Sequence, residues 1–438
     1  MATASATSLH VLARASEREE YGFAFWCLVF FTFIVLVAPQ AFFGFLQPLH
    51  LAKVSAILAL AAYVYQRVSQ GEPLLPKTPE IHLLGLFIFL AALSIPFSLW
   101  PGGSLGRLTD MYAKSLIVFL LTAQLLTTLP RFKQMLWFVL IFCIIVSFTA
   151  LAGYQQGDLV EGYRMRGGTA GLTSNPNDFA LTINLFLPFA FAFYALNPGR
   201  VRKSVCIIFV VTAVAAIMLT YSRAGFITLV VVLAICFWKM VGRGRRLKYI
   251  FPFLLVGAAF LLLAPQNYMD RLQAITDFSK DKSGSGEARW EAIKKTLEVI
   301  SEHPILGVGM GMNVLALNEK GLYWAHAHNV YLQIASEIGV LGMIVFVLLA
   351  ISLLRSVRLI QAQYKGAHQQ QELVVLAAAA ETGLLAFCIA ALFHPVAYHF
   401  YFYYIAGFVM ALKAIASRDK PVLSPVRPVT SRERKLWS

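Results

Sequence analysis

YWAHAHNVYLQIASEIGVLG, from Tyr323 to Gly342, is the stretch around which the chain is organised. It closes the longest polar segment of the sequence and opens a strongly apolar one. A spanning helix needs about 20 mostly apolar residues, so the stretch predicts a point where the chain re-enters a membrane. His326 and His328 lie in one short turn at this point.

The composition of the whole chain indicates a polytopic membrane protein. The 438 residues are 58% hydrophobic and only 13% charged, which is too apolar for a soluble protein of this length. The net charge of +15 would suit a nucleic-acid-binding protein, but the charges form short clusters between apolar runs. We therefore expect an all-α protein whose surroundings are membrane lipids, with no nucleic-acid partner.

Apolar segments long enough to span a bilayer occur twelve times. No signal-peptide cleavage site follows the polar first 20 residues, so the first segment is predicted to be an uncleaved membrane helix. The predicted spans are 22–38, 49–66, 82–100, 112–129, 135–152, 178–196, 204–220, 224–240, 249–264, 329–354, 373–393 and 399–416.

The distribution of lysine and arginine orients these spans. With both termini in the cytoplasm, 24 of the 37 basic residues lie on that side, as the positive-inside rule requires. Seven others fall in a long loop that the rule discounts, which leaves only six on the outer side or in the membrane. The predicted parts are a nine-helix region (1–264) with an outer loop at 153–177, a large outer loop (265–327), three C-terminal spans (328–416) and a basic cytoplasmic tail (417–438).

The large outer loop is predicted to contain an amphipathic helix. Between residues 287 and 302, Trp290, Ile293, Leu297 and Ile300 recur at helical spacing. Such a helix would lie on or beside the membrane face.

Four outer arginines are candidates for binding an anion. Arg223 lies between two predicted spans, where an arginine marks function or simply reaches the lipid headgroups. Arg289 begins the amphipathic helix and would also suit a solvated pair with a neighbouring glutamate. Arg164 and Arg166 lie in the smaller loop and would fit either phosphate or solvent. A guanidinium offers a planar fork that matches phosphate oxygens.

His328 is the candidate acid–base residue, because its unperturbed pKa is near neutrality and it lies at a helix start. His326 is two residues away, so the two side chains would point in different directions on a helix. No acidic residue adjoins the pair and no Asp-x-Asp occurs in the chain, so neither a metal site nor a cofactor is expected. Gly339 and Gly342 are interpreted as close-packing positions of the following helix.

These residues resemble the O-antigen ligase and O-antigen polymerase superfamily of bacterial membrane glycosyltransferases. The ligase pattern is histidine and a polar residue, nine residues, glycine, two residues and a glycine. It is matched by His328-Asn329, then Gly339 and Gly342. The segments SNPNDFA (174–180), SRAG (222–225) and HPILGVG (303–309) are also similar to family segments.

The resemblance implies a GT-C-type fold and metal-independent transfer with inversion, from undecaprenyl diphosphate to a lipid A–core or glycan acceptor. It also implies the bacterial inner membrane, with the active site on the periplasmic side. By motif position, His328 would match the family's essential histidine, Arg223 its arginine near the membrane edge and Arg289 its arginine in the large outer loop. We further expect Arg164 and Arg166 to bind the diphosphate with Arg223 and Arg289. The supporting residues are predicted to be His326, Asn329 and Asn177.

The sequence leaves alternatives open. A polysaccharide polymerase or a protein O-glycosylating enzyme would share the same motifs. A glycolipid transporter is an alternative of another class, although internal repeats, which transporters usually show, are not found in the sequence.

Overall fold

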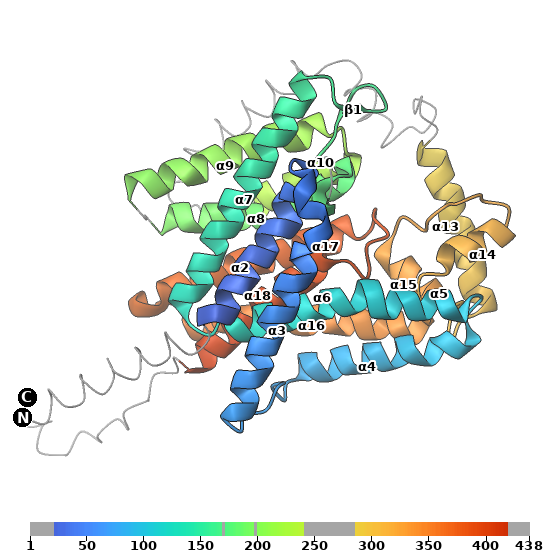
Figure 1. Cartoon of the computed structure of the whole chain (residues 1–438), viewed down its shortest axis with the longest axis horizontal. Helices are drawn as coiled ribbons and strands as arrows, with labels where there is room; N and C mark the ends of the chain where they lie inside the picture. Colours follow the sequence, from blue (N-terminus) through green and yellow to red (C-terminus); the bar gives the residue numbers. More distant parts are fainter. Residues whose placement is uncertain (1–21, 169–170, 197–198, 241–284, 419–438) are drawn as a thin grey trace, which may run out of the picture.

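The computed structural model describes residues 22–168, 171–196, 199–240 and 285–418, and these form a bundle of helices (Figure 1). Lipid offers no hydrogen-bond partner to the backbone, so apolar segments satisfy their N–H and C=O groups internally as helices. Within the described ranges, nine helical segments are long and apolar enough to cross a membrane, so the chain is a multi-pass membrane protein. They are Gly44–Ser69, Pro79–Phe97, Pro101–Leu125, Leu129–Gln155, Pro176–Ala195, Arg200–Leu219, Val340–Gln363, Gln371–Ala390 and Phe400–Arg418.

The described elements lie in the following order along the chain. The first half of the chain contains α2 (Gly22–Val37), η1 (Pro39–Ala41), η2 (Gly44–Leu49), α3 (Leu51–Ser69), α4 (Pro79–Ser94), η3 (Ile95–Phe97), α5 (Pro101–Gly106), the π-helical η4 (Arg107–Tyr112), α6 (Ala113–Leu125), α7 (Leu129–Gln155), the antiparallel strands β1 (Leu159–Val160) and β2 (Arg164–Met165), and η5 (Gly171–Thr173). The second half contains α8 (Pro176–Ala195), α9 (Arg200–Leu219), α10 (Arg223–Met240), α13 (Ser285–Glu302), α14 (Asn313–Glu319), α15 (Val330–Ile338), α16 (Val340–Gln363), η8 (His368–Gln370), α17 (Gln371–Ala390) and α18 (Phe400–Arg418).

Ten of the predicted spans each coincide with one helix and 329–354 with two, and the helical character of the fold is confirmed. The twelfth, 249–264, lies outside the described residues, as do 1–21 and 419–438, so the total of twelve stays a prediction. The amphipathic helix expected at 287–302 is present as α13. With α14 and α15 it gathers at one end of the bundle, on the right in Figure 1.

The prediction of one continuous helix over 329–354 is wrong. The helix breaks at Gly339, whose φ of 91° separates α15 from α16. A Cβ at this position would lie 2.0 Å from the carbonyl oxygen of Ile305, because the backbone of an earlier segment crosses here. The Val340 N–H donates to the Pro304 carbonyl at 2.9 Å instead of to the helix. The span therefore begins at Val340, and α15 is a separate short helix preceding it.

Three helices form the centre of the bundle. The apolar windows of α8 and α18 are each 78% buried, and that of α17 is 72% buried. By contrast, the Gly44–Ser69 segment is only 11% buried, as expected for a helix that faces lipid. α8 packs against α9, α10 and α17, and α18 packs against α6. The first residues of α8 and the loop before α18 are consequently fixed by the best-packed part of the molecule.

Glu381 is a charged residue within a span, and it has the partners that its cost in a membrane requires. Glu381 of α17 accepts hydrogen bonds from Lys239, from Arg358 at 2.8 Å and from Gln361 at 2.8 Å. This carboxylate joins three helices, so a structural role accounts for it.

Candidate active site

Asn329 fixes the start of α15 and with it the position of His328. The Asn329 side-chain oxygen accepts hydrogen bonds from the N–H groups of Tyr331 at 2.9 Å and Leu332 at 3.0 Å. This is an N-cap, which satisfies two backbone donors that the helix cannot. His328 directly precedes the cap and has a φ of 48°, an uncommon value for a residue other than glycine. The histidine is thus held by a strained and capped turn, a feature typical of functional sites.

The start of α15 is tied to the loop that follows α17. The Val330 N–H donates to the Ala391 carbonyl at 2.8 Å, and the Asn329 amide donates to the Leu392 carbonyl at 3.3 Å. His394 follows two residues later and is only 5% exposed. The structure therefore brings a second histidine to the same region as His328.

Both histidines are neutral over the physiological pH range. Burial, and then the positive charge of Arg289, lower the pKa of His328 to about 4. The same two causes lower the pKa of His394 to about 3. A neutral imidazole has one nitrogen able to accept a proton.

A cavity of about 180 Å³ is lined by His394 and by three of the four candidate arginines. One of these, Arg289, also acts on His328. Arg164 reaches it from β2, Arg223 from the first position of α10, and Arg289 from the first turn of α13. Three cations around one small cavity make it a site for an anion with several oxygens, such as a diphosphate. The remaining lining residues are Glu161, Asn177, Tyr221, Ser222, Ala224, Phe393 and His394.

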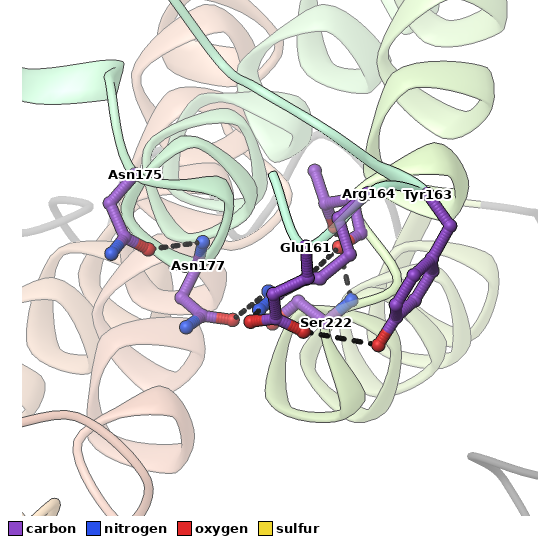
Figure 2. A network of polar contacts seen from close by, with 7 residues as sticks. Glu161, Tyr163, Arg164, Asn175, Asn177 and Ser222 are labelled. Atoms are coloured by element: carbon purple, nitrogen blue, oxygen red, sulfur yellow. Dashed lines mark hydrogen bonds and ion pairs between the residues drawn. The ribbon is translucent and has the colours of Figure 1, made fainter. Parts of the chain in front are cut away.

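Arg164 is buried and organises one wall of the cavity (Figure 2). Its guanidinium donates to the Thr220 carbonyl at 2.9 Å, to Glu161 at 3.1 Å and to the Asn177 side-chain oxygen at 3.0 Å. Asn175 caps α8 by accepting from the Asn177 N–H at 2.8 Å. Arg164 thereby connects the outer loop, the start of α8 and the turn that precedes Arg223.

Arg223 is positioned by a tight turn between α9 and α10. Tyr221 has a φ of 52°, which reverses the chain within the three residues that separate the helices. A Cβ on Gly225 would lie 2.5 Å from the Cβ of Ala180, so only glycine lets this turn approach α8. The Gly225 carbonyl accepts from Asn184 at 3.0 Å. The SRAG segment thus packs closely against α8, and this contact positions Arg223 at the cavity.

Four predicted site residues lie outside the cavity lining, namely Arg166, His326, His328 and Asn329. His328 and Asn329 lie at the start of α15, which is tied to the loop that carries His394. Arg166 is exposed and pairs with Asp158 at 3.2 Å. In a continuous strand its side chain would point to the same face as that of Arg164, but β2 ends at Met165. His326 is exposed, with its ring centroid 6.2 Å from that of His328. It is a neighbour of His328 and not a lining residue of the cavity.

Glu337 is a further residue of this region that sequence reasoning missed. It is 2% exposed and accepts hydrogen bonds from the Tyr398 hydroxyl at 2.6 Å and the Gly311 N–H at 2.9 Å. It therefore joins α15 to the glycine-rich segment 307–311 and to the loop that carries His394. Burial raises its pKa to about 7. In the sequence, Glu337 is noticeable only as a single carboxylate within the apolar stretch that follows His328. That position alone does not reveal its hydrogen-bond partners.

The fold and the site define a multi-pass membrane protein with a cavity lined by three arginines, near two neutral histidines. Residues 208–347 match the family model described as O-antigen ligase. This segment contains Arg223, Arg289 and His328 and supports membership of the O-antigen ligase and polymerase superfamily, with a ligase-type function or that of a close family member. Arg164 and His394 lie outside the matched segment. A comparison with curated proteins found no match.

Proposed function

We propose that the chain is an O-antigen ligase that transfers a glycan from undecaprenyl diphosphate to the lipid A–core oligosaccharide. The reaction would take place at the periplasmic face of the bacterial inner membrane. The observation that carries the proposal is the convergence of Arg164, Arg223 and Arg289 on one cavity next to His328 and His394. The family match supports the same class of reaction.

The proposed chemistry is one direct displacement. The acceptor hydroxyl oxygen attacks the anomeric carbon of the sugar, and the bond from that carbon to the diphosphate oxygen breaks with inversion. The hydroxyl proton passes to His328, and the electron pair of the broken bond stays on the diphosphate. Arg223 and Arg289 stabilise this growing negative charge, which is the largest contribution that fixed donors make to such reactions.

The lowered pKa of His328 fits a base that works only with the donor bound. In the empty site, burial and the charge of Arg289 keep the imidazole neutral. A diphosphate beside Arg289 offsets that positive charge and raises the proton affinity of the ring. The proton acceptor is therefore strengthened when the leaving group is in place.

The acceptor distinguishes a ligase from its relatives, so the test is transfer in vitro. Purified protein is supplied with undecaprenyl-diphosphate glycan and either lipid A–core, a second donor molecule or a serine-containing peptide. Glycan on lipid A–core, with release of undecaprenyl diphosphate, is the expected result. Extension of the second donor would assign a polymerase, and glycosylated peptide a protein-modifying enzyme. Movement of glycolipid across vesicles without cleavage of the diphosphate linkage would replace the enzyme by a transporter.

Arg223→Lys tests the cavity itself. Lysine keeps the charge but loses the planar fork, so the rate of transfer should fall while the protein remains folded. A wild-type rate for this variant would mean that Arg223 only reaches toward lipid headgroups.

A further inference from the structure

A second, larger cavity of about 710 Å³ lies on the other side of the α8 N-terminus. Its walls come from α2, α3, α6 and the start of α18, and η5 lies at its edge. Apolar side chains such as Ile34, Ala56, Leu60 and Ile117 form most of this lining. We call it the lipid-side groove, since α3 belongs to the least buried span among those described.

Two lysines lie at the edge of the lipid-side groove. Lys53 of α3 and Lys114 of α6 both line it and are exposed. Lys114 pairs with Asp110 at 2.6 Å, but both side chains are more than half exposed, so the ammonium retains donors for another anion. Asp178 is the one carboxylate among the described lining residues and comes from α8, whereas the lysines come from α3 and α6. Basic residues at a membrane surface attract anionic lipids.

Aromatic residues place the groove at the level of the lipid headgroups. Immediately before α3, Phe42, Phe43 and Phe45 are 50%, 56% and 73% exposed. Exposed aromatic side chains of this kind are enriched where hydrocarbon meets water. A lipid in the groove would have its headgroup near the lysines and its chains along the helices.

The lipid-side groove and the arginine cavity share one wall. Asn177 lines the arginine cavity and Asp178, the next residue, lines the groove. Likewise, His394 lines the cavity and His399 lines the groove, from the two ends of one loop. A headgroup held in the groove therefore lies next to the proposed site of reaction.

We propose that the lipid-side groove binds the acceptor as a phosphate-bearing lipid, with its phosphate on Lys53 and Lys114 and its chains against the apolar walls. This inference rests on the proposed function, because it names the second substrate of the same reaction. The acceptor is then carried by the membrane and is not a peptide. The wall formed by α8 and the 394–399 loop keeps the two lipid substrates apart while their headgroups meet.

The test compares lipid binding by two charge-matched variants. Native mass spectrometry measures the retention of lipid A, undecaprenyl phosphate and uncharged diacylglycerol on the purified full chain. K53Q/K114Q should lose lipid A affinity on the order of 30-fold, from two lysines at about 1 kcal/mol each, without losing binding of undecaprenyl-diphosphate glycan. K294Q/K295Q removes two lysines from α13, away from the groove, and should bind lipid A like the wild type.

A second variant tests the apolar walls without changing charge. Ala56→Trp fills the groove and should also reduce lipid A retention, with an unchanged helical circular dichroism spectrum. Wild-type lipid A binding in both K53Q/K114Q and Ala56→Trp would overturn the proposal. The proposal would also be overturned if the groove bound undecaprenyl phosphate in preference to lipid A, because it would then hold the chain of the donor. It would likewise be overturned if inorganic phosphate alone competed equally with lipid A for binding.

The experiments distinguish an error in the groove assignment from an error in the proposed function. If Arg223→Lys impairs transfer while K53Q/K114Q binds and glycosylates lipid A–core normally, only the groove assignment is wrong. If lipid A binds in a Lys53- and Lys114-dependent way but no glycan is ever transferred, the groove stands and the proposed function is wrong.

Discussion

His326 and His328 are separated by one residue but are expected to differ sharply in function. His328→Ala removes the proposed base, and general-base catalysis typically contributes about 10²- to 10⁴-fold to a rate. We expect a loss of this size in the transfer assay, with donor binding retained. His326→Ala is the matched control and should keep most of the activity, because this side chain is exposed, whereas that of His328 is half-buried and lies under the influence of Arg289. Equal losses in both variants would contradict the assignment of the base to His328.

Arg164 and Arg166 are also close in sequence, and their substitution is expected to have different effects. Arg164→Gln breaks charged hydrogen bonds to Glu161 and Asn177, each worth about 1.5–3 kcal/mol, and should lower both thermal stability and the rate of transfer. Arg166→Gln loses one exposed pair with Asp158 and should change stability by less than about 0.5 kcal/mol. Thermal unfolding in detergent and the transfer assay measure the two effects. A larger effect at Arg166 would mean that it, and not Arg164, reaches the donor.

Most of the candidate site could be predicted as a set of residues, but not as a geometry. A motif identifies His328 and Arg223 because chemistry restricts the residue type at each position. Arg166 could not be distinguished from Arg164, since the difference depends on β2 ending at Met165. His394 could be noted only as an outer-loop histidine, because its burial follows from the contact between that loop and α15.

At the scale of elements, the junction between α15 and α16 should be intolerant of a side chain at Gly339. A left-handed φ costs alanine about 1–2 kcal/mol, and the close approach of Ile305 adds roughly 1–3 kcal/mol of overpacking. Gly366→Ala is the matched control, because Gly366 has a φ of 86° but open space around it. The melting temperature in detergent should therefore fall further for Gly339→Ala than for Gly366→Ala. Equal shifts would mean that the close approach is unimportant.

Glu337 makes the packing of these elements depend on pH. Its folded-state pKa of about 7 lies above the usual carboxylic value, so the fold favours the protonated form. Its contribution to stability is fully present below the unfolded pKa and is lost as pH rises through about 7. Tyr398, Gln333 and the Gly311 N–H are the groups that face it.

The measurement of that pH effect is a difference between two proteins. The pKa values of His328 and His394 are lowered in the folded protein, so below their unfolded pKa these histidines make stability rise with pH. The melting temperature of the wild type alone therefore mixes this effect with the opposite effect of Glu337. The melting temperature of wild type minus that of Glu337→Gln should fall between pH 6 and pH 8. A constant difference over this window would show that Glu337 is already ionised in the folded protein at pH 6.

The helices themselves could be predicted well from the sequence, because lipid forces every long apolar segment into the same structure. The break at Gly339 could not, since a glycine in an apolar run is equally compatible with close helix packing. Only the crossing of residues 304–305 decides between the two. The same limit applies to α13. Its apolar face was predicted from the spacing of its residues, but its position beside the arginine cavity was implied only by the resemblance that assigned Arg289 to the diphosphate.

The whole molecule must have one orientation for the proposed reaction to work, and the basic residues predict it. With the arginine cavity outside, 24 of the 37 lysines and arginines face the cytoplasm. Tyr323 is 87% exposed in the segment that leads to His328, and Gln70 is exposed in the connection between α3 and α4. In intact spheroplasts, a membrane-impermeant maleimide should label Tyr323→Cys at once and Gln70→Cys only after permeabilisation. The parent protein is the control, since its five cysteines are free but buried or half-buried. The reverse pattern would put the cavity in the cytoplasm and contradict transfer at the outer face.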